Sequence, residues 1–112
     1  MEKYDYIEPY IAVDLDGTLS NNTGPNIPQF MIPGPVPAMV VRVKGWLAQG
    51  IKVKVFTARM SQNPDLWQKR IGDWTQCFVG TRLEATCIKD FGCIELWDDI
   101  AVGVAVNTGM PK

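Results

Sequence analysis

The sequence contains no histidine. This absence excludes Ser-His-Asp and Cys-His catalysis, and it also removes the usual zinc sites. Any chemistry must therefore come from carboxylates, hydroxyls, lysine and arginine, together with a hard metal ion where one is needed.

Cysteine is scarce, and charge of one sign is not in excess. Cys77, Cys87 and Cys93 form no CxxC pair, and their odd number argues against a disulfide framework. We interpret them as small buried apolar residues. The formal net charge of −1 gives no electrostatic reason to expect nucleic acid or an anionic membrane as a partner.

Long apolar runs are also missing. No segment approaches the length of a membrane span, and the first ten residues, "MEKYDYIEPY", lack signal-peptide character. We therefore expect a cytoplasmic protein with no membrane partner. The hydrophobic fraction of 46% and the four tryptophans are sufficient for a core, so we expect one domain over residues 1–112.

Apolar patterning predicts an α/β fold. Residues 20–37 hold five of the eight prolines and are expected to form a constrained loop. Helices are predicted over 36–50, ending at Gly50, and from Pro64, after an Asn63 N-cap, through about Thr75. The predicted strands cover residues 10–16, 51–57, 84–88, 92–97 and 102–107. Their alternation with helices implies a Rossmann-like parallel sheet of about five strands with right-handed crossovers.

The predicted strands end in carboxylates and a hydroxyl. In "IAVDLDGTLS", residues 11–20, an apolar run leads to Asp14 and Asp16. Thr57 ends the second strand, and Asp98 and Asp99 end a later one. Because ligands of open α/β sheets bind at the carboxyl ends of the strands, we expect these groups to converge on one crevice.

Such an acidic crevice requires a cation, because crowded carboxylates raise one another's pKa. Mg²⁺ is the natural candidate, since it takes carboxylate, water and phosphate oxygens. A metal-bound phosphate beside an aspartate favours attack by that aspartate, which would give an aspartyl-phosphate.

The motif set "DLDGT", "FTAR", Lys89 and "WDD", in that order, resembles the haloacid dehalogenase-like phosphohydrolases. The four motifs of that family are D-x-D-G-T, a Thr or Ser that closes a strand, a Lys, and a late acidic pair. All four are present between residues 14 and 99. The resemblance implies a Mg²⁺-dependent phosphatase or phosphotransferase.

The resemblance also assigns catalytic roles. It implies that Asp14 is the nucleophile and that Asp16 is the general acid and base. Thr57 would donate a hydrogen bond to the transferring phosphoryl group. Lys89 would neutralise the phosphoryl oxygens and the nucleophile.

Metal and substrate contacts follow from the same resemblance. Mg²⁺ would be bound by Asp14, by the backbone carbonyl of Asp16, by Asp98, and by Asp99 directly or through water. Substrate contacts would come from Thr57, Ala58, Arg59 and Lys89, and Arg59 is the rival of Lys89 for the cationic role.

The gaps after the first and second predicted strands are short, which is typical of a member of this family without a cap domain. Phe30, Met31 and Ile32 are expected to be exposed in the Pro-rich loop. An open site fits a macromolecular phosphate such as an oligonucleotide end, or a roof supplied by a neighbouring subunit in a homo-oligomer. We also expect weak discrimination among small esters. Trp46, Trp67 and Trp74 are interpreted as core residues.

Two alternatives from another functional class remain. Receiver-like regulatory domains also gather acidic residues, a Thr and a Lys around Mg²⁺ and a phospho-aspartate. Asp16 discriminates between the two, because water activation requires it. The second alternative is a degenerate scaffold without turnover, which the intact motif set disfavours.

Overall fold

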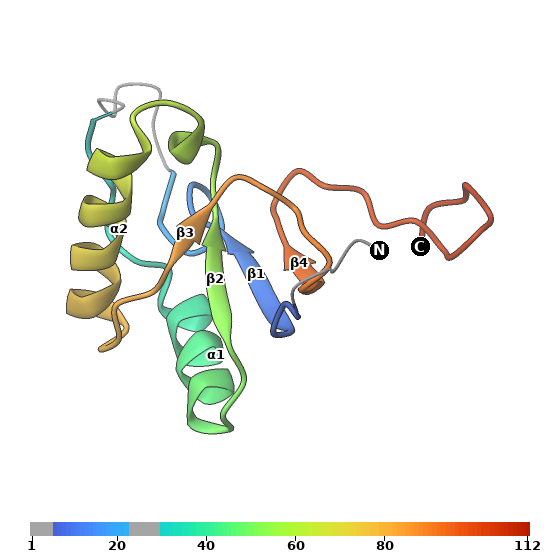
Figure 1. The fold of residues 1–112 in the computed structure, drawn as a ribbon, viewed down its shortest axis with the longest axis horizontal. Helices are drawn as coiled ribbons and strands as arrows, with labels where there is room; N and C mark the ends of the chain where they lie inside the picture. The colour runs from blue at the N-terminus through green and yellow to red at the C-terminus, as the bar shows by residue number, and fades with distance from the viewer. Residues whose placement is uncertain (1–5, 23–29) are drawn as a thin grey trace.

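The computed structural model describes residues 6–22 and 30–112. Here a parallel four-stranded sheet in the order β3-β2-β1-β4 packs against two α-helices, which confirms the predicted α/β class (Figure 1). In chain order the elements are β1 (Tyr10–Asp14), α1 (Pro37–Ala48), β2 (Val53–Phe56), a 3₁₀ helix (Ala58–Ser61), α2 (Pro64–Phe78), β3 (Ala85–Thr86) and β4 (Cys93–Trp97).

The strand β1 lies in the middle of the sheet, between β2 and β4. Val13 pairs with Val55 of β2 and with Trp97 of β4, and Ile11 pairs with Val53. Paired residues of parallel strands point to the same face, so these side chains form one apolar surface. The same register places the carboxyl ends of β1 and β4 side by side.

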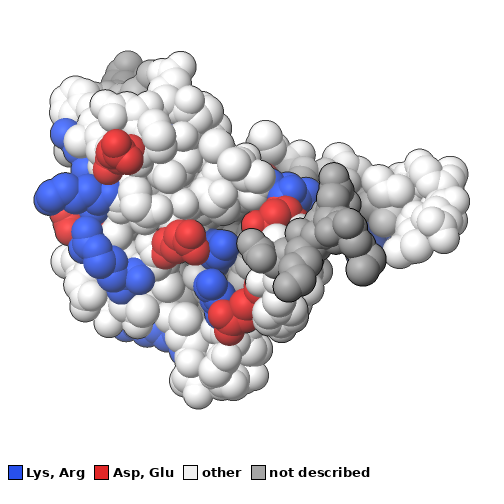
Figure 2. Space-filling model, viewed as in Figure 1, with Lys and Arg blue, Asp and Glu red and all other residues white. Residues whose placement is uncertain are grey.

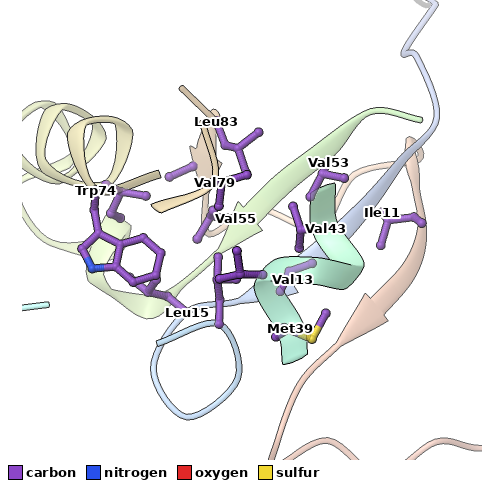
Figure 3. Packing of buried hydrophobic residues seen from close by; sticks show 14 residues of the cluster. Ile11, Val13, Leu15, Met39, Val43, Val53, Val55, Trp74, Val79 and Leu83 are labelled. Atoms are coloured by element: carbon purple, nitrogen blue, oxygen red, sulfur yellow. The ribbon is translucent and has the colours of Figure 1, made fainter. Parts of the chain in front are cut away.

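Both helices cover this apolar surface. Met39 and Val43 of α1 lie in the same buried cluster as Val13, together with Ile71 and Trp74 of α2 (Figure 3). Full burial of one such aliphatic side chain contributes about 1.5–3 kcal/mol. The core therefore fixes the two helices on the sheet, and with them the loops that leave the strand ends.

The helix α1 has the apolar face that its sequence predicts, and it ends where Gly50 predicts. Gly50 has φ +81°, a left-handed conformation that glycine adopts at little cost. Its N–H donates to Leu47 O, and the N–H of Ile51 donates to Trp46 O, both at 3.0 Å. This pair of bonds is the Schellman motif, which satisfies carbonyls left free at a helix end.

The helix α2 begins at Pro64, as predicted, and extends to Phe78, beyond the predicted end near Thr75. Asn63 occupies the N-cap position with φ +52°, but its side chain makes no capping hydrogen bond. Asn63 therefore marks the helix start through its backbone conformation, because asparagine tolerates left-handed φ better than most residues.

Four of the five predicted strands form, and the fifth, 102–107, does not join the sheet. Instead, Val104 bridges Pro111 in an extension that projects away from the helices (Figure 1). Asn107 at φ +65° and Gly109 at φ +70° turn the chain back on itself. Because of this turn, the segment forms backbone hydrogen bonds with the residues that follow it. The N–H of Ala105, for example, donates to Met110 O at 2.8 Å.

The cysteines are not buried as predicted. Cys77 and Cys87 are exposed and Cys93 is half-buried. The buried residues of α2 are Ile71, Gly72, Trp74 and Thr75, so Cys77 lies off the core-facing side of the helix. Isolated cysteines outside an apolar period give no burial signal of their own.

The charged side chains do not gather by sign on the face shown in Figure 2, where Lys and Arg lie interspersed with Asp and Glu. No helix among the described residues is both long and apolar enough to cross a membrane.

Candidate active site

The chain leaves β1 through a tight loop that follows directly from the sequence "DLDGTLS". The N–H groups of Thr18, Leu19 and Ser20 all donate to Leu15 O, at 2.8–3.2 Å. Gly17 has φ +87°, and a Cβ at this position would lie 2.6 Å from Asp99 Oδ2. Glycine is therefore required twice here, for its backbone conformation and for the close approach of the loop to the end of β4.

Three carboxylates meet where β1 and β4 end. Each of Asp14, Asp98 and Asp99 offers an oxygen within 4.8 Å of the others. Thr18 Oγ1 lies 3.4 Å from Asp14 Oδ2 and 3.5 Å from Asp99 Oδ1. The structure therefore brings together the three side-chain carboxylates that were predicted as metal ligands, which we call the acidic triad.

Burial raises the pKa of Asp14 from 3.8 to about 7, and the hydrogen bond with Asp99 and the charges of Asp98 and Asp99 act in the same direction. Three oxygen donors so close together, one of them held back from ionising by burial and by its neighbours, are suited to a hard divalent cation. The donor set thus fits Mg²⁺, and Asp14, Asp98 and Asp99 are the residues that would hold it.

Asp16 is not part of the acidic triad. Arg59 Nε and Nη2 donate to its two carboxylate oxygens, each at 2.8 Å, and Nη2 also donates to Met31 O at 3.0 Å. The Asp16 side chain is therefore directed toward Arg59, which also binds the backbone of Met31. A bidentate pair of this kind is strong and geometrically defined.

Thr57 and Ala58 lie at the carboxyl end of β2, next to β1. Thr57 is 2% exposed, and its Oγ1 accepts a hydrogen bond from Arg59 N–H at 3.2 Å, which starts the 3₁₀ helix. The Thr57 hydroxyl proton is free to be donated elsewhere. Ala58 lines the cavity beside Asp16.

Lys89 lies in the loop between β3 and β4 and is exposed. Within the described chain, no ion pair or hydrogen bond joins it to the acidic triad, and its charge acts on the Cys93 thiol at the start of β4. Its catalytic role therefore stays a prediction.

Two hollows flank the site. The larger, about 650 Å³, is lined by Asp16, Arg59 and Trp67 among others. The smaller, about 340 Å³, is lined by Gly17, Thr18, Asp98 and Asp99 and by residues of α1. Asp98 and Asp99 of the acidic triad therefore line one cavity, and Asp16 lines the other.

The sequence did not predict that a tryptophan lies beside Asp16. Trp74 is buried, and Trp46 packs on Trp97. Trp67 lies under the Arg59 guanidinium, with 4.6 Å between the guanidinium carbon and the ring centroid. The position of Trp67 in the first turn of α2, shortly after Thr57, is the signal that could have identified it.

The Pro-rich loop is described only in part. Phe30 and Met31 are exposed, as predicted, whereas Ile32 is half-buried against the core. Ile32 packs inward because Trp74 Nε1 donates to the next carbonyl, Pro33 O, at 3.0 Å. Between β2 and α2 there is only the short 3₁₀ helix. Residues 23–29 of the first gap lie outside the described residues.

Comparisons with protein-family models, with curated proteins and with solved structures gave no match to this chain.

Proposed function

We propose that the protein is a Mg²⁺-dependent phosphatase or phosphotransferase of the haloacid dehalogenase-like type, which acts on phosphate monoesters through an aspartyl-phosphate. One observation supports this above all: the acidic triad forms at the adjoining ends of β1 and β4, with Asp16 on the loop that follows Asp14. The motif order of the sequence agrees with this arrangement.

Asp14 is the nucleophile in this proposal. One carboxylate oxygen attacks phosphorus, an O–P bond forms, and the bond from phosphorus to the ester oxygen breaks. Asp14 must be ionised to attack, and burial together with its acidic neighbours opposes this by raising its pKa to about 7. Mg²⁺ bound by Asp14, Asp98 and Asp99 would favour the ionised carboxylate and offset the charge of the phosphate.

Asp16 supplies and removes the protons. As a carboxylic acid it protonates the departing ester oxygen, and as a carboxylate it then takes a proton from water. That water attacks the aspartyl-phosphate, which releases inorganic phosphate and regenerates Asp14. Arg59 holds both Asp16 oxygens, so Asp16 must leave this pair, at least in part, to reach the ester oxygen.

The remaining predicted residues stabilise charge. Thr57 donates its hydroxyl proton to a phosphoryl oxygen, and Lys89 supplies an ammonium to the phosphoryl group. Phosphoryl transfer depends mainly on such positioning and charge stabilisation.

The Arg59–Asp16 pair also favours a second candidate, a phosphate-responsive regulatory domain. If Arg59 keeps Asp16 in the pair, Asp14 can accept a phosphoryl group but the aspartyl-phosphate has no base to activate water. The protein would then hold the phosphoryl group without turning over.

One experiment separates the two candidates. The purified protein is incubated with Mg²⁺ and a panel of phosphate esters that spans sugars, nucleotides and DNA ends. Phosphate release and the protein mass are followed together, with EDTA and Asp14→Asn as controls. Continuous release that EDTA blocks supports the enzyme. A stable mass increase of one phosphoryl group supports the regulatory domain, and neither result in any condition refutes both.

A further inference from the structure

We propose that the cavity beside Asp16 binds the leaving group of the phosphate ester and that this group is a nucleoside, so that the substrate is a terminal nucleotide. This inference rests on the function proposed above and names its substrate class.

The position of the cavity determines which part of a substrate it receives. The larger hollow is lined by Asp16 but not by Asp14, Asp98 or Asp99. In the proposed reaction the phosphoryl group sits at Asp14, and Asp16 protonates the ester oxygen on the far side of phosphorus. The group attached to that oxygen therefore extends from Asp16 into the larger hollow.

The size of the cavity argues against a small leaving group. Its volume of about 650 Å³ lies in the range of about 300–1,000 Å³ typical of sites for drug-sized ligands. A nucleoside occupies a substantial part of such a volume, whereas glycerol or a short alcohol would leave most of it to water.

The walls combine flat and polar groups. Phe30 and Trp67 line the cavity, and so do Asn22 and Gln62. The Arg59 guanidinium lies over the Trp67 ring, so the exposed Phe30 is the ring that can stack on a base. In the described chain the side-chain amides of Asn22 and Gln62 have no hydrogen-bond partner. Aromatic rings stack on nucleobases, and amides pair with their donor and acceptor edges. A sugar alone has neither the π-face nor the edges of a base.

The aromatic wall is held in place by hydrogen bonds from other elements. Arg70 Nη1 donates to Phe30 O at 2.9 Å, and Arg59 Nη2 donates to Met31 O at 3.0 Å. Two residues further along, Pro33 O accepts from Trp74 Nε1 at 3.0 Å. The backbone that carries Phe30 is therefore fixed to α2 and to the segment after β2, so Phe30 is positioned before a ligand arrives.

The charges of the cavity favour a neutral leaving group. The two charged side chains that line it, Arg59 and Asp16, have opposite signs and are bonded to each other. A second phosphate inside the cavity would need a further cation, whereas a nucleobase is uncharged at neutral pH, so the next phosphate of a strand end would lie outside the cavity.

The kinetic test compares adenosine 5′-monophosphate with ribose 5-phosphate, which lacks the base. We expect the wild-type protein to prefer the nucleotide at least tenfold in kcat/KM, and Phe30→Ala to reduce that preference about tenfold, in the range of losing one stacking contact. The control is Phe91→Ala, which removes a phenylalanine that is 100% exposed and outside the cavity lining. This control should leave the preference unchanged. Equal use of the two esters, or an equal loss on both in Phe30→Ala, would overturn the inference.

A binding test keeps the inference separate from the proposed function. Asp14→Asn is titrated with adenosine 5′-monophosphate, with ribose 5-phosphate and with a 5′-phosphorylated oligonucleotide, and tryptophan fluorescence is recorded. Tighter binding of either base-containing ligand, weakened by Phe30→Ala, supports the inference even where no ester is hydrolysed. Tighter binding of adenosine 5′-monophosphate would indicate a free nucleotide as the substrate, and tighter binding of the oligonucleotide would indicate a strand end. Hydrolysis of esters by the wild type without such preferential binding would leave the proposed function standing and refute the inference.

Discussion

At the residue scale, the function depends on Asp14. Asparagine nearly matches aspartate in shape but cannot form an acyl-phosphate, so we expect Asp14→Asn to lose turnover by several orders of magnitude. The fold should persist, because the substitution also removes one charge from the acidic triad. Phosphate release and thermal unfolding of the same preparation provide the measurements. Retained turnover in a clean sample would exclude the covalent mechanism.

The choice between Lys89 and Arg59 is a second question at this scale. The triad, Asp16 and a phosphate bring more negative charge than the two positive charges of one Mg²⁺. Because Arg59 is already bonded to Asp16, we expect Lys89 to act on the phosphoryl group. A compact ammonium also fits between two oxygens better than a planar guanidinium does.

Lys89→Ala should therefore reduce kcat about a hundredfold or more, the scale of losing one preorganised charge, without changing stability. Arg59→Ala should raise KM more than it lowers kcat. Steady-state kinetics of both variants decide the matter. An essential Arg59 beside a dispensable Lys89 would show that Lys89 is a surface residue only.

Two glycines allow a matched comparison. Gly17 and Gly50 both have left-handed φ, so alanine should cost each position about 1–2 kcal/mol of stability. The two positions differ in the space around an added Cβ. At Gly17 the Cβ would lie 2.6 Å from Asp99 Oδ2, whereas at Gly50 it would meet nothing within 4 Å.

We therefore expect both variants to unfold more easily, and only Gly17→Ala to lose Mg²⁺-dependent activity as well. Denaturant unfolding and phosphate release check this pair. Equal loss of activity in both variants would mean that backbone strain alone is responsible.

At the element scale, the sequence predicts the sheet and helices well because their signals are local. The helical spacing of Met39, Val40 and Val43 predicts the buried face of α1. The Asn63-Pro64 pair predicts the start of α2. Strands that lead into Asp14 and Asp98 were sufficient to predict that these carboxylates meet, since ligand groups of an open α/β sheet gather at the carboxyl ends of its strands.

Other features could not be predicted because they depend on tertiary contacts. Nothing in the local sequence indicates that Arg59 reaches Asp16. The cavity of about 650 Å³ beside Asp16 offers more surface for a leaving group than the short gaps between the elements indicate. The predicted fifth strand, 102–107, has the right composition for a strand, but alternation does not specify which partner its backbone bonds to.

The C-terminal extension leads to a prediction at the same scale. Its backbone bonds run within residues 103–112, and Ile100, Val102 and Val106 are exposed. An isolated hairpin is marginally stable, so its amides should exchange with solvent about a hundredfold or more faster than those of β1. Hydrogen-exchange mass spectrometry measures both. Protection of 102–106 equal to that of β4 would show that the segment pairs with a sheet.

At the scale of the whole molecule, Asp14 links stability to pH. Its pKa is about 7 in the folded protein against an ordinary value of 3.8. Between these values the folded chain keeps a proton that the unfolded chain has released, so this group makes the free energy of unfolding fall as pH rises from about 4 to 7. Above pH 7 the folded protein bears the full free-energy cost of an ionised, partly buried Asp14 beside Asp98 and Asp99.

Mg²⁺ should relieve this penalty and therefore stabilise the protein more at pH 8 than at pH 5. The scale is set by ligand linkage, about 2.7 kcal/mol at a hundredfold excess over Kd. Thermal unfolding with and without Mg²⁺ at the two pH values measures it, and Asp14→Asn should show a smaller increment with little pH dependence. An increment that is equal at both pH values in the wild type would argue against metal binding at the triad.

The sheet order also sets when the site can form during synthesis. β1 and its Asp14 are made near the start of the chain, but Asp98 and Asp99 follow β4, which is made last and pairs with β1 across the length of the sequence. Such long-range pairing closes slowly. A nascent chain that has completed α1, β2 and α2 therefore displays Asp14 without its acidic partners, and the charge cluster forms only once β4 has paired with β1.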